Sequence, residues 1–217
     1  TIIVNYAGLI FVALNIEFLP RISSLKNEIK LLKNNIELQL KALNIITLFL
    51  SVTLYVFSDL IIKILYSNDF LDASMIIKLA SFSIPLNGVT YTIAYLHLIK
   101  NYKVKYVILN SIFPGLVFMI SGYIFNTYFG IIGLGITLTF TSVFHYLAVV
   151  FYVRKDLSIN IKNLFNYNLI ISIIILSILL SFDFFEIQNI IYIKALIFIT
   201  TFIFCIKQYL KPNLLNK

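Results

Sequence analysis

Long apolar runs separated by short polar connections make up most of this chain. Seven of these runs predict membrane-spanning helices, because a helix needs about 20 mostly apolar residues to cross a bilayer. The runs are continuous rather than alternating, which favours helices over the strands of a barrel. The pattern therefore predicts an all-α integral membrane protein with about seven transmembrane helices. The predicted spans are Ile2–Leu19, Leu43–Leu65, Ser74–Leu98, Val104–Asn126, Phe129–Val153, Tyr167–Phe182 and Ile190–Tyr209.

Composition agrees with a membrane protein and gives no sign of an enzyme. Hydrophobic residues make up 60% of the chain and charged residues 12%, whereas soluble domains carry about 25% charged residues. One cysteine and two histidines are too few and too scattered for a metal site. The sequence has neither a Gly-rich phosphate loop nor a serine-nucleophile motif. We therefore expect no catalytic residues, no metal and no cofactor.

Basic residues mark one side of the membrane. The first, third and fifth connections and the C-terminal end hold 14 of the 17 Lys and Arg residues. The alternate connections, SNDFLDA, NTYFG and DFFEIQN, hold none. Because cytoplasmic loops carry such an excess of basic residues, the odd connections and the C-terminus are predicted to be cytoplasmic. The chain would be a multi-pass protein of the inner (cytoplasmic) membrane, and its net charge of +8 reflects topology and contact with membrane lipids, not nucleic-acid binding.

The first connection, residues 21–42, has a helical period of its own. Six apolar residues recur at spacings of three and four, which places them on one face of a helix. They are Ile22, Leu25, Ile29, Leu32, Ile36 and Leu40. The sequence predicts an amphipathic helix on the inner leaflet, with its lysines near anionic headgroups. A solvated connector is the alternative.

Three stretches of the chain resemble motifs of a known transporter family. They are FLPRISSLKN, IIKILYSNDFLDAS and NSIFPGLVFMISGYIFNTYFGIIGLGITLTFTS. In this order they are similar to motifs of the lipid-linked oligosaccharide flippases of the Wzx type, in the multidrug, oligosaccharidyl-lipid and polysaccharide exporter superfamily. Ser67 stands where the family usually has Gly, and Gly135 where Ala is common. The matching positions are Pro20, Ile22, Ser23, Ser24, Leu65, Tyr66, Phe70, Ala73, Asn110, Gly130 and Gly133.

The resemblance implies a MATE-like fold, in which two similar lobes contain twelve to fourteen helices. Residues 1–153 would form the five spans of the C-terminal lobe that follow its first helix, and residues 154–217 would add two C-terminal helices. The chain would then be a piece of a longer transporter. The implied activity is translocation, by alternating access, of a polysaccharide repeat unit carried on a polyprenyl pyrophosphate, as in O-antigen and lipopolysaccharide synthesis. The implied partners are this lipid-linked oligosaccharide, a polysaccharide polymerase and a chain-length regulator.

Charged residues in the predicted spans are candidates for function, because a charge at the bilayer centre costs about 2.5–3.5 kcal/mol on insertion scales. Lys78 has no acid one helical turn away. It either snorkels to the interface or faces a cavity, where its ammonium would attract substrate phosphates. Asp59 and Lys63, four residues apart, predict a local ion pair, and Lys63 is a second cavity candidate. Glu17 and Asp59 are candidates for ion coupling, with an interfacial carboxylate as the alternative for Glu17.

Polar and helix-bending residues form a second set of candidates. Asn87 and Tyr91 could line the substrate cavity. Pro85, Gly88 and Pro114 could act as hinges, because a proline removes a backbone hydrogen bond and bends its helix. The alternative is that they are ordinary residues of membrane helices, in which Gly and Pro are frequent.

Small residues also repeat every four positions in the fifth predicted span. Gly133 is followed by Thr137 and Thr141, and Gly135 by Thr139. This spacing favours close packing of helices over contact with a solute.

Two other functions remain as alternatives at this point. A multidrug or cation antiporter of the same superfamily would need a pocket with acidic residues, which are scarce in the predicted spans. A membrane polysaccharide polymerase would need a larger outer loop than these connections provide.

Overall fold

The computed structural model describes residues 29–101, 104–157, 167–185 and 190–210, together with the single positions Ala13 and Ile16. The first predicted span, Glu17 and the FLPRISSLKN stretch lie outside these ranges, apart from the two single positions. Within the described ranges all the regular structure is helical, as predicted. The elements are α2 (Ile29–Val56), α3 (Ser58–Leu65), η1 (Asn68–Ala73), α4 (Ser74–Ala80), α5 (Ser83–Asn101), α6 (Val104–Phe129), η2 (Gly130–Ile132), α7 (Gly133–Leu157), α9 (Tyr167–Phe184) and α10 (Ile190–Tyr209).

The length and composition of these helices are those of a multi-pass membrane protein. Four described stretches are long and apolar enough to cross a bilayer, one of them a hairpin that contains most of α6 and α7. Large apolar side chains are exposed along α6, α9 and α10, as expected for helices that face lipid. The four stretches are Glu37–Val56, Ile112–Phe151, Tyr167–Phe184 and Ile190–Tyr209.

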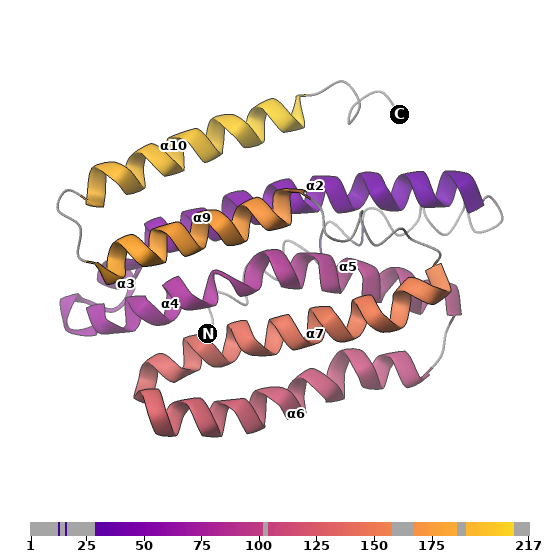
Figure 1. Ribbon diagram of the computed structural model, residues 1–217, viewed down its shortest axis with the longest axis horizontal. Helices are drawn as coiled ribbons and strands as arrows, with labels where there is room; N and C mark the ends of the chain where they lie inside the picture. The colour runs from indigo at the N-terminus through magenta and orange to yellow at the C-terminus, as the bar shows by residue number, and fades with distance from the viewer. Residues whose placement is uncertain are drawn as a thin grey trace.

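The helices lie side by side along the long axis of the molecule (Figure 1). α2 packs on α5, α9 and α10, and α7 packs on α4, α5 and α6. The main core lies where Leu48, Val52 and Tyr55 of α2 meet Leu176 and other side chains of α9 and α10. Most of the packing between the C-terminal pair, α9 and α10, and the other described helices is therefore made by α2.

The two ends of the helix bundle gather different helix ends (Figure 1). The end on the left of Figure 1 gathers α3, η1, the turn between α6 and α7, the end of α9 and the beginning of α10. These elements flank or contain the three connections without Lys or Arg. The beginning of α2, the end of α5, the beginning of α6 and the end of α7 lie at the opposite end, whereas α10 runs from the left end only toward the middle of the view. The helix ends next to the connections without Lys or Arg therefore lie away from the beginning of α2 and the end of α7, which border basic connections.

The described part of the predicted amphipathic loop is not a separate helix. α2 begins at Ile29 and runs without interruption to Val56, so the boundary predicted after residue 42 is absent. The reason is that the apolar period of the loop continues in phase into the span. Leu40 and Leu43 are both 1% exposed and lie on one buried face.

The third predicted span is two helices rather than one helix bent at Pro85. α4 ends at Ala80 and α5 begins at Ser83. Pro85 therefore lies in the first turn of α5, where a missing N–H breaks no helical hydrogen bond. The helix predicted to bend at Pro85 is instead interrupted at Ser81 and Phe82, and a hinge role for Pro85 stays a prediction. Helices continue through the other two hinge candidates, Gly88 and Pro114.

Hydroxyl side chains satisfy the carbonyl groups at this break. The Thr139 hydroxyl of α7 donates to the Leu79 carbonyl at 2.7 Å, and the Ser83 hydroxyl donates to the Ala80 carbonyl at 2.6 Å. Interrupted helices are tolerated in a bilayer when such groups replace the lost backbone bonds. The hydrogen bond from Thr139 therefore stabilises the break and connects α4 to α7.

The glycines at the beginning of α7 permit close packing, as the four-residue repeat predicts. A Cβ atom on Gly135 would lie 2.9 Å from Leu79 Cβ and 3.0 Å from the Ile76 carbonyl oxygen. Gly122 of α6 faces Thr137, and a Cβ atom on this glycine would lie 3.5 Å from the Thr137 methyl group. Small residues thus bring α7 against both α4 and α6.

One exposed turn carries backbone strain that a glycine would relieve. Ser67, before η1, has φ 102° and ψ 172°, a region that is essentially restricted to glycine and costs about 1–3 kcal/mol for other residues. We expect Ser67→Gly to raise the free energy of unfolding by about 1 kcal/mol or more, measured by thermal unfolding in detergent. Ser177→Gly, in the exposed interior of α9, is the control and should instead lower it by a few tenths of a kcal/mol. A loss of stability in Ser67→Gly would contradict the assignment of strain.

Candidate functional site

Four charged side chains from four helices meet at the end of the molecule that lacks basic connections. They form the charged cluster: Asp59 of α3, Lys78 of α4, Asp183 of α9 and Lys194 of α10. The Lys78 ammonium lies 3.1 Å from Asp59 Oδ1 and 3.4 Å from Asp183 Oδ2. The Lys194 ammonium lies 2.6 Å from Asp183 Oδ1. The charges of the two carboxylates and the two ammonium groups thus compensate one another.

Asp183 is the centre of the cluster. Its carboxylate contacts both lysines and also accepts a hydrogen bond from the Tyr55 hydroxyl at 3.0 Å. The side chains of Asp183, Lys78 and Lys194 are only 14%, 12% and 10% exposed. Buried charges are tolerated when they are paired and hydrogen-bonded, and this pairing links α9 and α10 to α2, α3 and α4.

The ion pair predicted between Asp59 and Lys63 is wrong. The partner of Asp59 is Lys78, which lies 19 positions away in the sequence and on another helix. Lys63 is exposed and can keep its ammonium hydrated, whereas the Lys78 side chain is mostly covered and requires a counter-charge. Lys78 itself neither snorkels nor stands alone, because two carboxylates lie within 3.4 Å.

Sequence reasoning missed Asp183, Lys194 and Tyr55 as members of this site. A usable signal was present, because the only basic residues outside the basic connections and the C-terminal end are Lys63, Lys78 and Lys194. Asp183 and Lys194 also flank one short connection, so a hairpin of α9 and α10 brings them together.

A cavity of about 620 Å³ lies next to the cluster, between α3 and α10. We call it the α3–α10 pocket. Its polar edge consists of Asp59, Lys63, Asn68 and Lys194, and the remaining walls are apolar. The apolar residues are Val56, Phe57, Leu60, Leu71, Ile190, Ile191, Ala195, Phe198 and Ile199.

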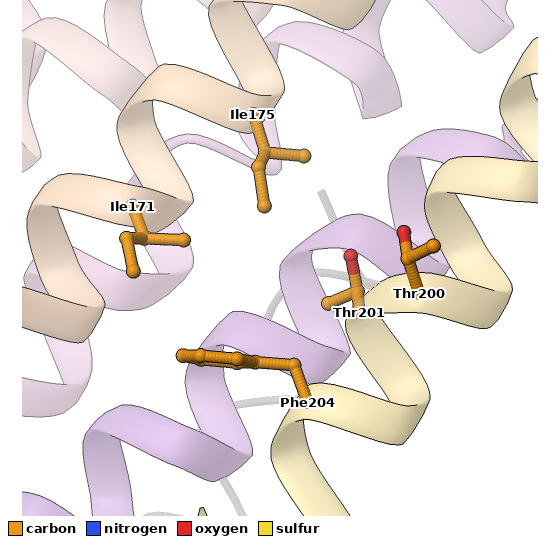
Figure 2. Close-up of a pocket in the computed structure, with 5 residues that line it drawn as sticks. All are labelled: Ile171, Ile175, Thr200, Thr201 and Phe204. Atoms are coloured by element: carbon orange, nitrogen blue, oxygen red, sulfur yellow. The ribbon is translucent and has the colours of Figure 1, made fainter.

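A smaller cavity of about 260 Å³ lies between α9 and α10 (Figure 2). Ile171 and Ile175 of α9 point across the gap toward Phe204 of α10. Thr200 and Thr201 donate to the Ile197 carbonyl of their own helix. The gap is thus apolar in character, which suits hydrocarbon rather than a charged ligand.

The predicted cavity residues are only partly brought together. Lys63 lines the α3–α10 pocket, whereas Asn87 and Tyr91 belong to α5 and line none of its walls. Asn87 is half-buried and Tyr91 is 43% exposed. Glu17 lies outside the described residues.

Comparison with known proteins places the chain by its fold. No family model matches the chain, and no curated protein does. Among solved structures, it is similar to the lipid II flippase MurJ in its inward closed conformation, with a TM-score of 0.62 and 22% sequence identity. The match covers 95% of this chain and 46% of that chain, so the chain spans about half the length of that protein. The described chain therefore has the fold of part of a MATE-like membrane transporter.

Proposed function

We propose that this chain is one lobe of a transporter that moves a lipid-linked oligosaccharide across the cytoplasmic membrane. The observation that carries the proposal is the match of nearly the whole chain to less than half of a lipid II flippase. The motifs around Pro20, Phe70 and Gly133 favour a polysaccharide repeat unit on a polyprenyl pyrophosphate as the substrate. The product would serve a polysaccharide polymerase and its chain-length regulator, as in O-antigen and lipopolysaccharide synthesis.

Alternating access is the mechanism that suits such a fold. In this mechanism two lobes rock against each other around a site near the middle of the bilayer. A lobe that rocks must itself stay rigid, and two features of this chain supply rigidity. The charged cluster links four helices at one end, and the Thr139 hydroxyl ties α7 to the break after α4.

The candidate substrate-binding residues differ in how free their polar groups are to meet a substrate. Lys78 is a candidate for attracting substrate phosphates, but two carboxylates already neutralise its charge. Asn87 and Tyr91 on α5 are candidates that could offer polar groups to a sugar, since both retain some exposure. The charged cluster does not favour a cation antiporter, because lysine ammonium groups lie against both of its carboxylates and compete with a cation.

The proposal is tested by measuring which membrane leaflet holds the lipid-linked glycan. We expect deletion of the gene in its host to accumulate this intermediate on the cytoplasmic leaflet, and the full-length protein to relieve the accumulation. Lys207→Gln, at the opposite end of α10, is a matched control and should relieve it as well. Normal distribution in the deletion strain, with no second transporter present, would refute the proposed function.

A double variant separates the two roles of Lys78. Lys78→Gln alone leaves Asp59 unpaired, whereas Lys78→Gln combined with Asp59→Asn removes both charges of the pair. If Lys78 acts through the cluster, the double variant should restore both membrane abundance and transport. If its charge attracts the substrate, the double variant should restore abundance but not transport.

We also propose that the end of the molecule with the charged cluster faces away from the cytoplasm, with the C-terminus inside. Asp69 of η1 and Lys207 in the last turn of α10 are both exposed, and α10 runs away from the end that holds η1 (Figure 1). In intact cells we expect a membrane-impermeant maleimide to label Asp69→Cys but not Lys207→Cys, with Cys205 replaced by Ser. The reverse labelling pattern would overturn this orientation.

A further inference from the structure

We propose that the α3–α10 pocket binds an anionic phospholipid of the surrounding membrane, with the lipid phosphate at Lys63 and hydrocarbon against the apolar wall. The site is separate from the gap between α9 and α10. It does not depend on the proposed function, because it requires only a membrane protein with this pocket.

One positive group at the edge of the pocket, Lys63, has no ion-pair partner among the described residues. Asp59 is paired with Lys78, and Lys194 with Asp183. Among the described residues, no acid lies within ion-pair distance of Lys63, whose side chain is exposed at the pocket edge. A fixed ammonium beside an apolar wall is complementary to a molecule with an anionic head and an apolar tail.

The size and position of the pocket also suit a lipid. Its volume of about 620 Å³ falls within the range of about 300–1,000 Å³ that ligand sites occupy. The polar edge lies near η1 and the beginning of α10, at the end of the molecule. The apolar wall continues along α10 through Phe198 and Ile199. A lipid headgroup at the membrane surface would therefore meet Lys63 and Asn68, and its acyl chain would follow α10.

A tryptophan reporter makes this proposal testable, because the chain contains no tryptophan. Ile191 lines the pocket and is 71% exposed, and Met119 of α6 is 72% exposed outside it. The full-length protein, without other tryptophans, is reconstituted with brominated phosphatidylglycerol or brominated phosphatidylcholine, which quench nearby tryptophan. We expect Ile191→Trp to bind the anionic lipid about fivefold more tightly than the neutral lipid, the factor for one lysine near anionic lipid. Met119→Trp should show no preference.

Lysine variants identify the group that recognises the phosphate. Lys63→Gln should remove the preference at Ile191→Trp, and Lys207→Gln should leave it unchanged, with circular dichroism showing that both variants stay helical. Equal quenching by the two lipids at Ile191→Trp, or a preference that survives Lys63→Gln, would overturn the proposal. Stronger competition by a polyprenyl pyrophosphate than by phosphatidylglycerol would also overturn it, because the pocket would then belong to the transported lipid.

Discussion

Asp183→Asn should lower the free energy of unfolding by about 3–5 kcal/mol, the usual effect of removing one partner from a buried ion pair. The Asp183 carboxylate holds Lys194 at 2.6 Å and Lys78 at 3.4 Å and accepts the Tyr55 hydroxyl. Without its charge, Lys194 stays buried with no described counter-charge. Unfolding in mixed detergent micelles measures the loss.

The same variant should loosen the attachment of α10 to α2. Cys205 of α10 is 7% exposed, and its sulfur lies 3.7 Å from the Ile45 carbonyl oxygen of α2. We expect a thiol reagent to modify Cys205 faster in Asp183→Asn than in the native protein. Unchanged modification, together with unchanged stability, would show that the cluster does not hold the C-terminal pair in place.

Two further variants distinguish an ion-pair network from a general effect of mutation. The Asp59 side chain is 49% exposed, so Asp59→Asn should cost only about 1 kcal/mol or less, as for surface pairs. Asp183→Asn combined with Lys194→Gln should be less harmful than the sum of the two single changes, because the double variant leaves no buried unpaired lysine. Strict additivity would contradict coupling between these residues.

The cluster also shows which parts of the structure the sequence could predict. A membrane-spanning helix can be predicted from the apolar residues of its own segment, without knowledge of its neighbours. Helices accordingly appear in all six predicted spans from Leu43 onward. The sequence favours a bend at Pro85 over the observed break at Ser81 and Phe82, because a proline can end one helix or begin the next. The observed break is accompanied by a hydrogen bond from the Thr139 hydroxyl of another helix to the Leu79 carbonyl, a contact that the local sequence does not reveal.

Contacts between distant segments were harder to predict than the helices. The four-residue spacing of Asp59 and Lys63 favours a local pair, but burial of Lys78 decides which lysine takes the carboxylate. Asp183 and Lys78 lie far apart in the sequence, on helices α9 and α4 that both pack on α2. Their proximity could be inferred only by counting the lysines that the charge rule leaves unexplained.

The turn between α6 and α7 gives the second large prediction, and it concerns a close approach between backbones. A Cβ atom on Gly133 would overlap the carbonyl oxygen of Phe125 and would lie 2.5 Å from its carbon and 2.8 Å from the backbone nitrogen of Asn126. All three are backbone atoms of α6, so no side chain can rotate away. Gly133→Ala must therefore move α7 away from α6, and we expect it to lower the free energy of unfolding by about 1–3 kcal/mol, as for overpacked cores.

A second glycine of the same hairpin supplies a control with the opposite sign. A Cβ atom on Gly115 would meet nothing within 4 Å, and Gly115 lies inside the helix α6. Gly115→Ala should therefore raise the free energy of unfolding by about 0.5–1 kcal/mol, since glycine weakens a helix interior. Thermal unfolding of the two variants in the same detergent compares them directly. If both variants raised the free energy of unfolding, the backbones of α6 and α7 would be farther apart than the structure places them. The effect of Gly133→Ala would then reflect only the better helix propensity of alanine.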